Sequence, residues 1–249
     1  MGVVTVTGCA ARRRELGRCL RAYRDLVDPS RVGLHATGRR RAPGLRREEV
    51  AVLAGVGVTW YTWLEQGRVT ASDQVLEAVA RVYGIDDVGR EHLRALCRPA
   101  DDGPGAGPDG LRPLLDGWPA DPAAVLDARL DVVAVNDAWA RVWGPPGRHV
   151  LEDLVDDGPD DDVELLVRAL ARRLRMATDR APQDPRLHEV HTRVRNVAPH
   201  LHPVWECRGI GAFGRPAARV GGADRVAYLL GEAGVPDPTG ATVLALLPG

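Results

Sequence analysis

The segment from Leu45 to Arg68 reads LRREEVAVLAGVGVTWYTWLEQGR. Apolar residues recur at helical spacing up to Gly55, and the pattern restarts after Gly57 and stops at Gly67. Glycine readily adopts the left-handed conformation that ends a helix, so the pattern predicts two short helices joined by a tight turn. Such a pair forms a helix-turn-helix, whose second helix enters the major groove of DNA.

The two predicted helices have one face for a core and another for DNA. The residues expected to point inward are Val50, Ala54, Val56, Tyr61 and Leu64, with the small Ala51 where the helices cross. The second helix then carries outward the side chains that would touch base edges, namely Val58, Thr59, Thr62 and Trp63. Trp60 and Trp63 cannot both share the buried face with Tyr61, so at least one is expected to be exposed, against DNA or a partner.

Arginines flank the two helices. They are Arg39, Arg40, Arg41, Arg46, Arg47 and Arg68. A guanidinium group supplies both the charge and the hydrogen-bond donors that a phosphate contact needs, so these residues are predicted to contact the DNA backbone. Arginines away from the motif, such as Arg18 and Arg21, are expected only to solvate a surface.

Charge is distributed unevenly along the 249 residues. Residues 1–99 hold 17 arginines and 11 acidic residues (net +6), and residues 100–249 hold 16 and 23 (net −7). A basic first part and an acidic second part predict different partners. The chain has no lysine, which excludes lysine-dependent chemistry and is typical of a GC-rich bacterial genome. No signal peptide or long apolar run is present, so we expect a cytoplasmic protein without a membrane partner.

The composition predicts two domains of different class. Residues 98–110, RPADDGPGAGPDG, are rich in Pro, Gly and Asp and read as a linker. Residues 12–97 show about five short helical patterns, and residues 111–249 mix a valine-rich strand (130–136), an amphipathic helix after Val163 and two final strands. The predicted fold class is therefore multidomain, all-α followed by α+β.

Residues 15–97 resemble the N-terminal domain of the MmyB-like regulators, within the xenobiotic-response-element (Cro/C1-type) helix-turn-helix superfamily. PGLRREEVAVLAGVGVTWYTWLEQGR and the following SDQVLEAVARVYGIDDVGREHLRAL carry the resemblance. It implies a five-helix bundle that binds operator DNA as a homodimer. It also implies that Arg47 touches the DNA backbone, that Gly57 is the N-cap of the recognition helix, and that the base-reading positions are Val58, Thr59, Thr62 and Trp63. The family usually has Ser at position 57 and Arg at position 63, so the cap is weaker here and the operator sequence does not carry over.

The second domain resembles the MmyB-like ligand-binding domain at both of its ends. LRPLLDGWPADPAAVLDARLDVVAVNDAWARVWG, from Leu111, and DRVAYLLGEAGVPDPTGATVLALLPG, from Asp224, carry the resemblance. It implies a PAS-like antiparallel sheet with helices around an apolar pocket for a small, lipid-like or fatty-acid-like effector, and no other cofactor. Trp139 and Trp143, four residues apart, would share a helix face and are the candidates to line that pocket. Plain core packing is the alternative for both.

Four histidines precede Cys207 in the second domain, namely His188, His191, His200 and His202. Their spacing matches no zinc module, so solvated or locally hydrogen-bonded side chains are expected and no metal site is predicted. The motifs of serine hydrolases, zinc proteases and phosphate-binding loops are absent from the sequence, and we expect no enzyme.

The sequence therefore predicts a DNA-binding transcription regulator whose second domain senses a small molecule, with the sign of regulation left open. One alternative is a helix-turn-helix protein whose second domain binds a protein partner and has no ligand pocket. Another is a metal-dependent enzyme or sensor built on the four histidines.

Overall fold

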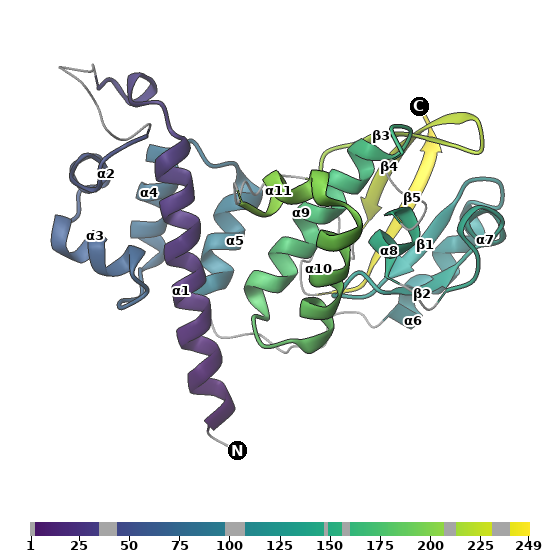
Figure 1. The fold of residues 1–249 in the computed structure, drawn as a ribbon, viewed down its shortest axis with the longest axis horizontal. Helices are drawn as coiled ribbons and strands as arrows, with labels where there is room; N and C mark the ends of the chain where they lie inside the picture. The colour runs from purple at the N-terminus through teal and green to yellow at the C-terminus, as the bar shows by residue number, and fades with distance from the viewer. Residues whose placement is uncertain are drawn as a thin grey trace. The chain divides into compact units, whose positions relative to one another are not determined.

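The computed structural model describes residues 3–34, 44–97, 108–146, 149–155, 160–206, 213–230 and 240–249 (Figure 1). The chain forms two compact units. The first contains residues 1–101 together with 179–183 and 207–212, and the second contains 102–178, 184–206 and 213–249. Among the described helices, none has the length and apolar character needed to span a membrane.

The described segments of the first unit contain helices joined by turns and loops, and no strand. Its elements are α1 (Val3–Leu26), the 3-10 turn η1 (Pro29–Val32), α2 (Arg47–Ala54), α3 (Val58–Glu65), α4 (Asp73–Tyr83) and α5 (Asp87–Cys97). This confirms the expected bundle of five α-helices. Its core contains buried leucines from α1, α3, α4 and α5. Leu45, Val50 and Tyr61 add to this core from the segment that holds the helix-turn-helix.

Local sequence signals set the ends of these helices. Ser72 is the N-cap of α4, where its hydroxyl accepts the Val75 N–H at 3.4 Å. Gly84 ends the same helix with φ +65°, and its N–H reaches the carbonyl groups of the last turn. The start and stop predicted for this helix are thus confirmed.

The second unit contains an antiparallel sheet. Its strands are β1 (Ala123–Leu126), β2 (Val132–Val135), β3 (Ala217–Val220), β4 (Ala223–Leu230) and β5 (Thr242–Pro248), in the order β2-β1-β5-β4-β3. In the register of the central strands, Val125 of β1 lies opposite Val243 of β5 and Ala134 of β2. The predicted α+β class is confirmed, and the final pair of predicted strands corresponds to β4 and β5.

Helices and short turns complete the second unit. They are α6 (Pro108–Leu111), η2 (Arg112–Gly117), α7 (Asp137–Trp143), α8 (Val150–Val155), α9 (Glu164–Arg180), α10 (Pro185–Val197), η3 (Pro199–Leu201) and α11 (His202–Glu206). Residues 98–107 of the predicted linker lie outside the described residues. Residues 108–110, also assigned to the linker, begin α6 instead, because proline is well suited to the first position of a helix.

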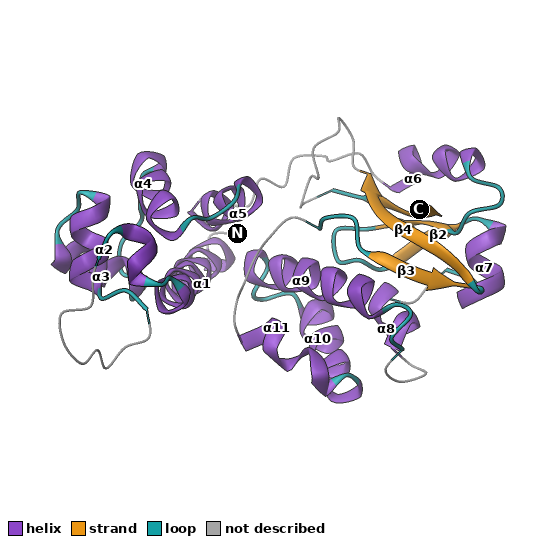
Figure 2. Cartoon of the chain, turned by 90° about the horizontal axis from the view of Figure 1, so that it is seen from above, coloured by secondary structure: helices purple, strands orange, loops and turns teal. Residues whose placement is uncertain are grey.

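Each face of the sheet has its own apolar core. Alternating residues of β1 and β5 point to opposite faces: Leu126 and Leu244 join one core, and Val125 and Val243 join the other. The first and larger core lies under α7, α8, α9, α10 and α11, and the second is covered by α6 and η2. Figure 2 shows α6 on one side of the strands and α8 to α11 on the other.

Candidate nucleic-acid interface

Helices α2 and α3 form a helix-turn-helix with a three-residue turn (Figure 1). Gly55 takes φ +69°, which only glycine adopts without strain, and the Val56 N–H returns to the Ala51 carbonyl at 2.9 Å. Gly57 is the N-cap of α3 and has no side chain to cap it, as the sequence suggested. The turn predicted from the opening stretch is confirmed.

Helix α3 presents two distinct faces. Tyr61 and Leu64 are fully buried, whereas Thr59 is exposed and Val58 and Trp63 are 38% and 43% exposed. Thr62 is half-buried and its hydroxyl donates to the Val58 carbonyl at 2.9 Å. The structure thus places all four side chains expected to read bases along the outer side of α3. Trp60 is half-buried, so Trp63 is the more exposed of the two tryptophans.

A buried carboxylate fixes the position of α3. Glu65, the last residue of α3, has a side chain only 2% exposed. It accepts the Nε–H of Arg24 from α1 and the Nε–H of Arg47 from α2, both at 2.6 Å. Arg24 also donates to the Leu45 carbonyl at 2.8 Å. One acidic side chain therefore links three helices, and sequence reasoning missed this role.

Buried phenols join α3 to α4. The Tyr61 and Tyr83 hydroxyl groups share a short hydrogen bond, and the Tyr83 ring stacks on Tyr23 of α1 with centroids 6.2 Å apart. Burial raises the pKa of Tyr61 and of Tyr83 well above the ordinary value of tyrosine, so both phenols stay neutral. This contact holds the buried face of α3 while its outer face remains exposed.

Close backbone packing sets the distance between α1 and α3. A Cβ atom added at Gly17 would lie 2.2 Å from the Glu65 carbonyl oxygen, which is backbone and has little freedom to move. The crossing therefore requires glycine at this position of α1. Gly57, at the other end of α3, has no such neighbour within 4 Å.

The structure describes three of the six predicted phosphate-contacting arginines. Arg46 is the exposed N-cap of α2, and its backbone N–H donates to Glu49 Oε2 at 2.7 Å. Arg47 is 40% exposed although its Nε binds Glu65, and Arg68 is exposed just beyond α3. These side chains lie at the edges of the helix-turn-helix. The other three, Arg39, Arg40 and Arg41, lie outside the described residues.

The two candidate pocket residues of the second unit lie in the larger core. Trp139 and Trp143 share one face of α7, as predicted, with ring centroids 4.4 Å apart, and Trp139 is 1% exposed. A small hollow in this unit has room for about one water molecule. It is lined by Asp127, Ala128, Leu130, Arg173, Met176, Ala177 and Gly240, and by neither tryptophan.

The four histidines have four different partners. His188 Nδ1 lies 2.9 Å from the Asp184 carbonyl oxygen, and the His191 ring meets Trp205 edge-on at 4.6 Å. His200 Nε2 lies 3.1 Å from Glu164 Oε2, and His202 Nε2 accepts from Arg195 at 2.9 Å. Within the described part of the chain they form no group of three metal-binding side chains, and Cys207 lies outside it.

Comparison with protein families finds two matches. Residues 15–93 match the model described as a helix-turn-helix domain, and residues 108–221 match the MmyB-like transcription regulator ligand binding domain. No curated protein matches the chain. The first match covers the whole of α2 and α3, and the second begins at α6 and includes β1 to β3.

Proposed function

We propose that the chain, which carries a helix-turn-helix domain and an MmyB-like transcription regulator ligand binding domain, binds a specific operator through α3 and responds to a small apolar effector. The exposure of α3 carries the DNA-binding part of this proposal. Its inner face is fixed by Tyr61, Leu64 and Glu65, so its outer face is rigid and is presented to solvent. A rigid helix with an exposed first turn is what direct base readout in the major groove requires.

The outer side chains of α3 suit particular base contacts. The Thr59 hydroxyl can exchange hydrogen bonds with any base edge, and the methyl groups of Val58 fit the methyl group of thymine. Thr62 already donates to the Val58 carbonyl, which leaves its hydroxyl oxygen as an acceptor. Trp63 replaces a guanine-reading arginine with a large apolar surface. We therefore expect an operator richer in A·T pairs at the position that Trp63 faces.

The arginines are proposed to hold the DNA backbone. Arg46 and Arg47 stand at the start of α2, the helix that crosses the backbone in this motif, and Arg68 follows α3. The bond from Arg47 Nε to Glu65 orients the guanidinium group, which lowers the entropy lost when it binds a phosphate. We propose the same role for Arg39, Arg40 and Arg41. A homodimer on an inverted repeat would place two copies of α3 about one helical turn apart.

The effector is proposed to bind in the second unit, between the sheet and the helices that cover its larger core. That core is made of apolar side chains from the sheet and from the helices, including Leu126, Trp139 and Leu244, so a ligand bound there would contact hydrocarbon groups. An apolar or fatty-acid-like molecule suits this environment better than a charged metabolite, whose desolvation would be uncompensated. An effector changes operator affinity only through unequal binding to two conformations.

One observation favours a second candidate function for this unit. Trp139 is fully buried and packs against the Trp143 ring, as expected if the second domain were a protein-interaction module with a solid core. Native mass spectrometry of the full chain with a series of fatty acids distinguishes the two functions. One bound molecule per chain, with a change in operator affinity of about 5-fold or more, supports the effector. The absence of binding across the series would favour the interaction module.

The DNA-binding proposal is tested by selection from sheared genomic DNA of the source organism at several salt concentrations. We expect enriched fragments to bind the full chain about 10³-fold more tightly than scrambled duplexes, with affinity falling steeply as salt rises. The double variant Arg47→Ala, Thr59→Ala should lose this preference. Arg21→Ala, which removes an exposed arginine of α1, is the matched control and should keep it. Equal binding to enriched and scrambled DNA would refute the proposal.

A further inference from the structure

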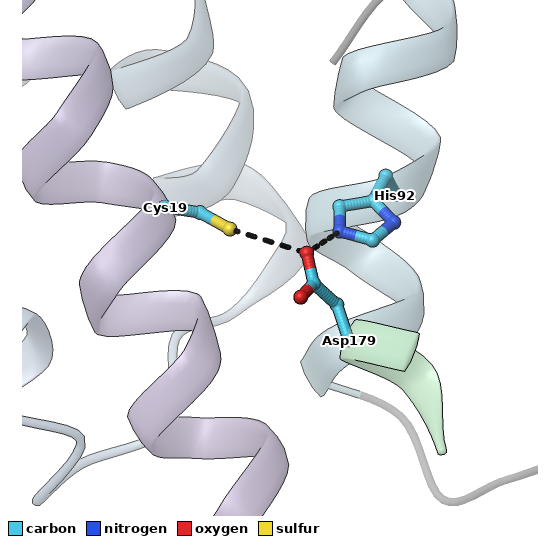
Figure 3. A group of neighbouring side chains, drawn as sticks. All are labelled: Cys19, His92 and Asp179. Carbon is cyan, nitrogen blue, oxygen red and sulfur yellow. Dashed lines mark hydrogen bonds and ion pairs between the residues drawn. The ribbon is translucent and has the colours of Figure 1, made fainter. Parts of the chain in front are cut away.

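Three metal-binding side chains from distant parts of the sequence meet in the first unit (Figure 3). Cys19 lies on α1, His92 on α5 and Asp179 in the last turn of α9, where the chain belongs to the first unit. Cys19 Sγ lies 3.9 Å from Asp179 Oδ2, and His92 Nε2 lies 3.5 Å from the same oxygen. All three ligand atoms are within 4.8 Å of one another.

The cluster is shielded from solvent. Cys19 and His92 are 0% exposed and Asp179 is 4% exposed. Figure 3 shows the dashed lines from the Cys19 thiol and from the His92 imidazole meeting at one oxygen of the Asp179 carboxylate. A divalent cation suits such a buried cluster, because it compensates the charges of a carboxylate and a thiolate at once.

The types of ligand atom select the kind of metal. A sulfur, a nitrogen and an oxygen ligand suit Zn²⁺ and neighbouring transition metals, whereas Mg²⁺ and Ca²⁺ prefer oxygen alone. In a tetrahedral zinc site with ordinary bond lengths, the S–O separation is about 3.5 Å and the N–O separation about 3.3 Å. The S–O and N–O distances observed here exceed these by a few tenths of an ångström, and the S–N separation is within 4.8 Å, so the three side chains would rotate toward a bound ion.

We propose that Cys19, His92 and Asp179 form a binding site for one divalent transition-metal ion of the zinc type. Three protein ligands leave the fourth tetrahedral position to water or to another donor. Binding expels the proton of the Cys19 thiol, so the affinity falls as the pH is lowered. The ion would tie α1 to α5 and to residue 179, and would therefore stabilise the unit that carries the helix-turn-helix.

Cobalt provides the most direct test, because a thiolate bound to Co²⁺ produces a charge-transfer absorption band that oxygen and nitrogen ligands do not. The chain has four cysteines. In a full-length background in which Cys9, Cys97 and Cys207 are all replaced by serine, Cys19 supplies the one remaining thiol. We expect this reduced protein to bind one Co²⁺ per chain with the charge-transfer band, and to release it to an excess of Zn²⁺.

Variants of the carboxylate and of the thiol complete the test. Asp179→Asn should weaken Co²⁺ binding by about 10-fold or more, and Cys19→Ser should abolish the band. Asp87→Asn, which changes an exposed carboxylate of α5, is the matched control and should leave both unchanged. Zn²⁺ should raise the melting temperature of the unaltered chain by a few degrees. This measurement does not depend on the folding of any variant. The proposal would be overturned if the single-thiol background gave no thiolate band, or if the band persisted in Cys19→Ser. The three side chains would then form a hydrogen-bonded cluster without a metal.

Discussion

The replacement Glu65→Gln tests how the position of α3 is fixed. Glutamine keeps the size of the side chain but removes the charge that faces Arg24 and Arg47, both 2.6 Å away. Burial alone would lower the pKa of Arg24, and the bond to Glu65 is the main interaction that raises it instead. The change therefore leaves a guanidinium group that is only 9% exposed without its main counter-charge.

The expected loss follows from the exposure of the two arginines. Removing one partner of a buried ion pair costs about 3–5 kcal/mol of unfolding free energy. Arg24 keeps the Leu45 carbonyl and Asp25, at 2.8 and 2.9 Å, so we expect the lower end of that range. Arg47 is 40% exposed, and solvent screening limits its share to about 1 kcal/mol or less. The total loss should be about 3–4 kcal/mol.

Urea unfolding of the full chain, followed by circular dichroism, measures this loss. Hydrogen exchange of peptides that cover α3 then shows where it arises. Glu77→Gln is the matched control, because Glu77 also faces two arginines but is 32% exposed, and it should cost less than about 1 kcal/mol. Equal stability of the two variants would refute the idea that Glu65 holds α3 in place.

Further predictions concern other parts of the chain. Burial lowers the pKa of His149 to about 4, below the value of about 6.5 in an unfolded chain. Its neutral ring donates to the Arg129 carbonyl and accepts from the Leu151 N–H. The second unit should therefore keep its full stability above about pH 6.5 and lose up to about 3 kcal/mol as the pH falls towards 4. Melting curves measured against pH should show this slope, and His149→Gln should flatten it. Gly17→Ala should destabilise the first unit by about 1–3 kcal/mol in urea unfolding, because its new methyl group would meet the Glu65 carbonyl. Gly57→Ser, in open space at an N-cap, should be neutral or stabilising by a few tenths of a kcal/mol. Trp63→Arg should create a preference for guanine at one position of each half-site, worth about 1–3 kcal/mol in a binding selection. An unchanged base preference would mean that Trp63 does not face the bases.

The parts of the fold that sequence could predict are those set by neighbouring residues. Gly55 and Gly84 end helices through their own backbone conformation, and Ser72 caps α4 three residues ahead of its hydrogen-bond partner. The burial of Tyr61 and Leu64 and the exposure of Trp63 follow from helical periodicity alone. The outer face of α3 could therefore be read from a single sequence.

Contacts between distant residues could not be predicted in this way. Glu65 meets Arg24 across 41 positions, and Cys19 meets Asp179 across 160, so no spacing rule connects them. Strand β1 was also missed, because Ala123–Leu126 is buried at every residue and shows no alternation of polar and apolar side chains. The four histidines are close together in the sequence, but α10 and the segment after it turn them toward separate partners.

In the proposed interface, α3 reads bases while the arginines at α2 hold phosphates. The most direct test compares the affinities of Thr59→Ala and Arg47→Ala for operator and scrambled DNA over a range of salt concentrations. We predict that Thr59→Ala lowers operator affinity alone and leaves the salt dependence unchanged. Arg47→Ala should weaken both duplexes about equally and reduce the slope of log affinity against log salt by about 1. If Thr59→Ala weakened both duplexes equally, or left operator binding unchanged, α3 would not be the helix that reads the operator.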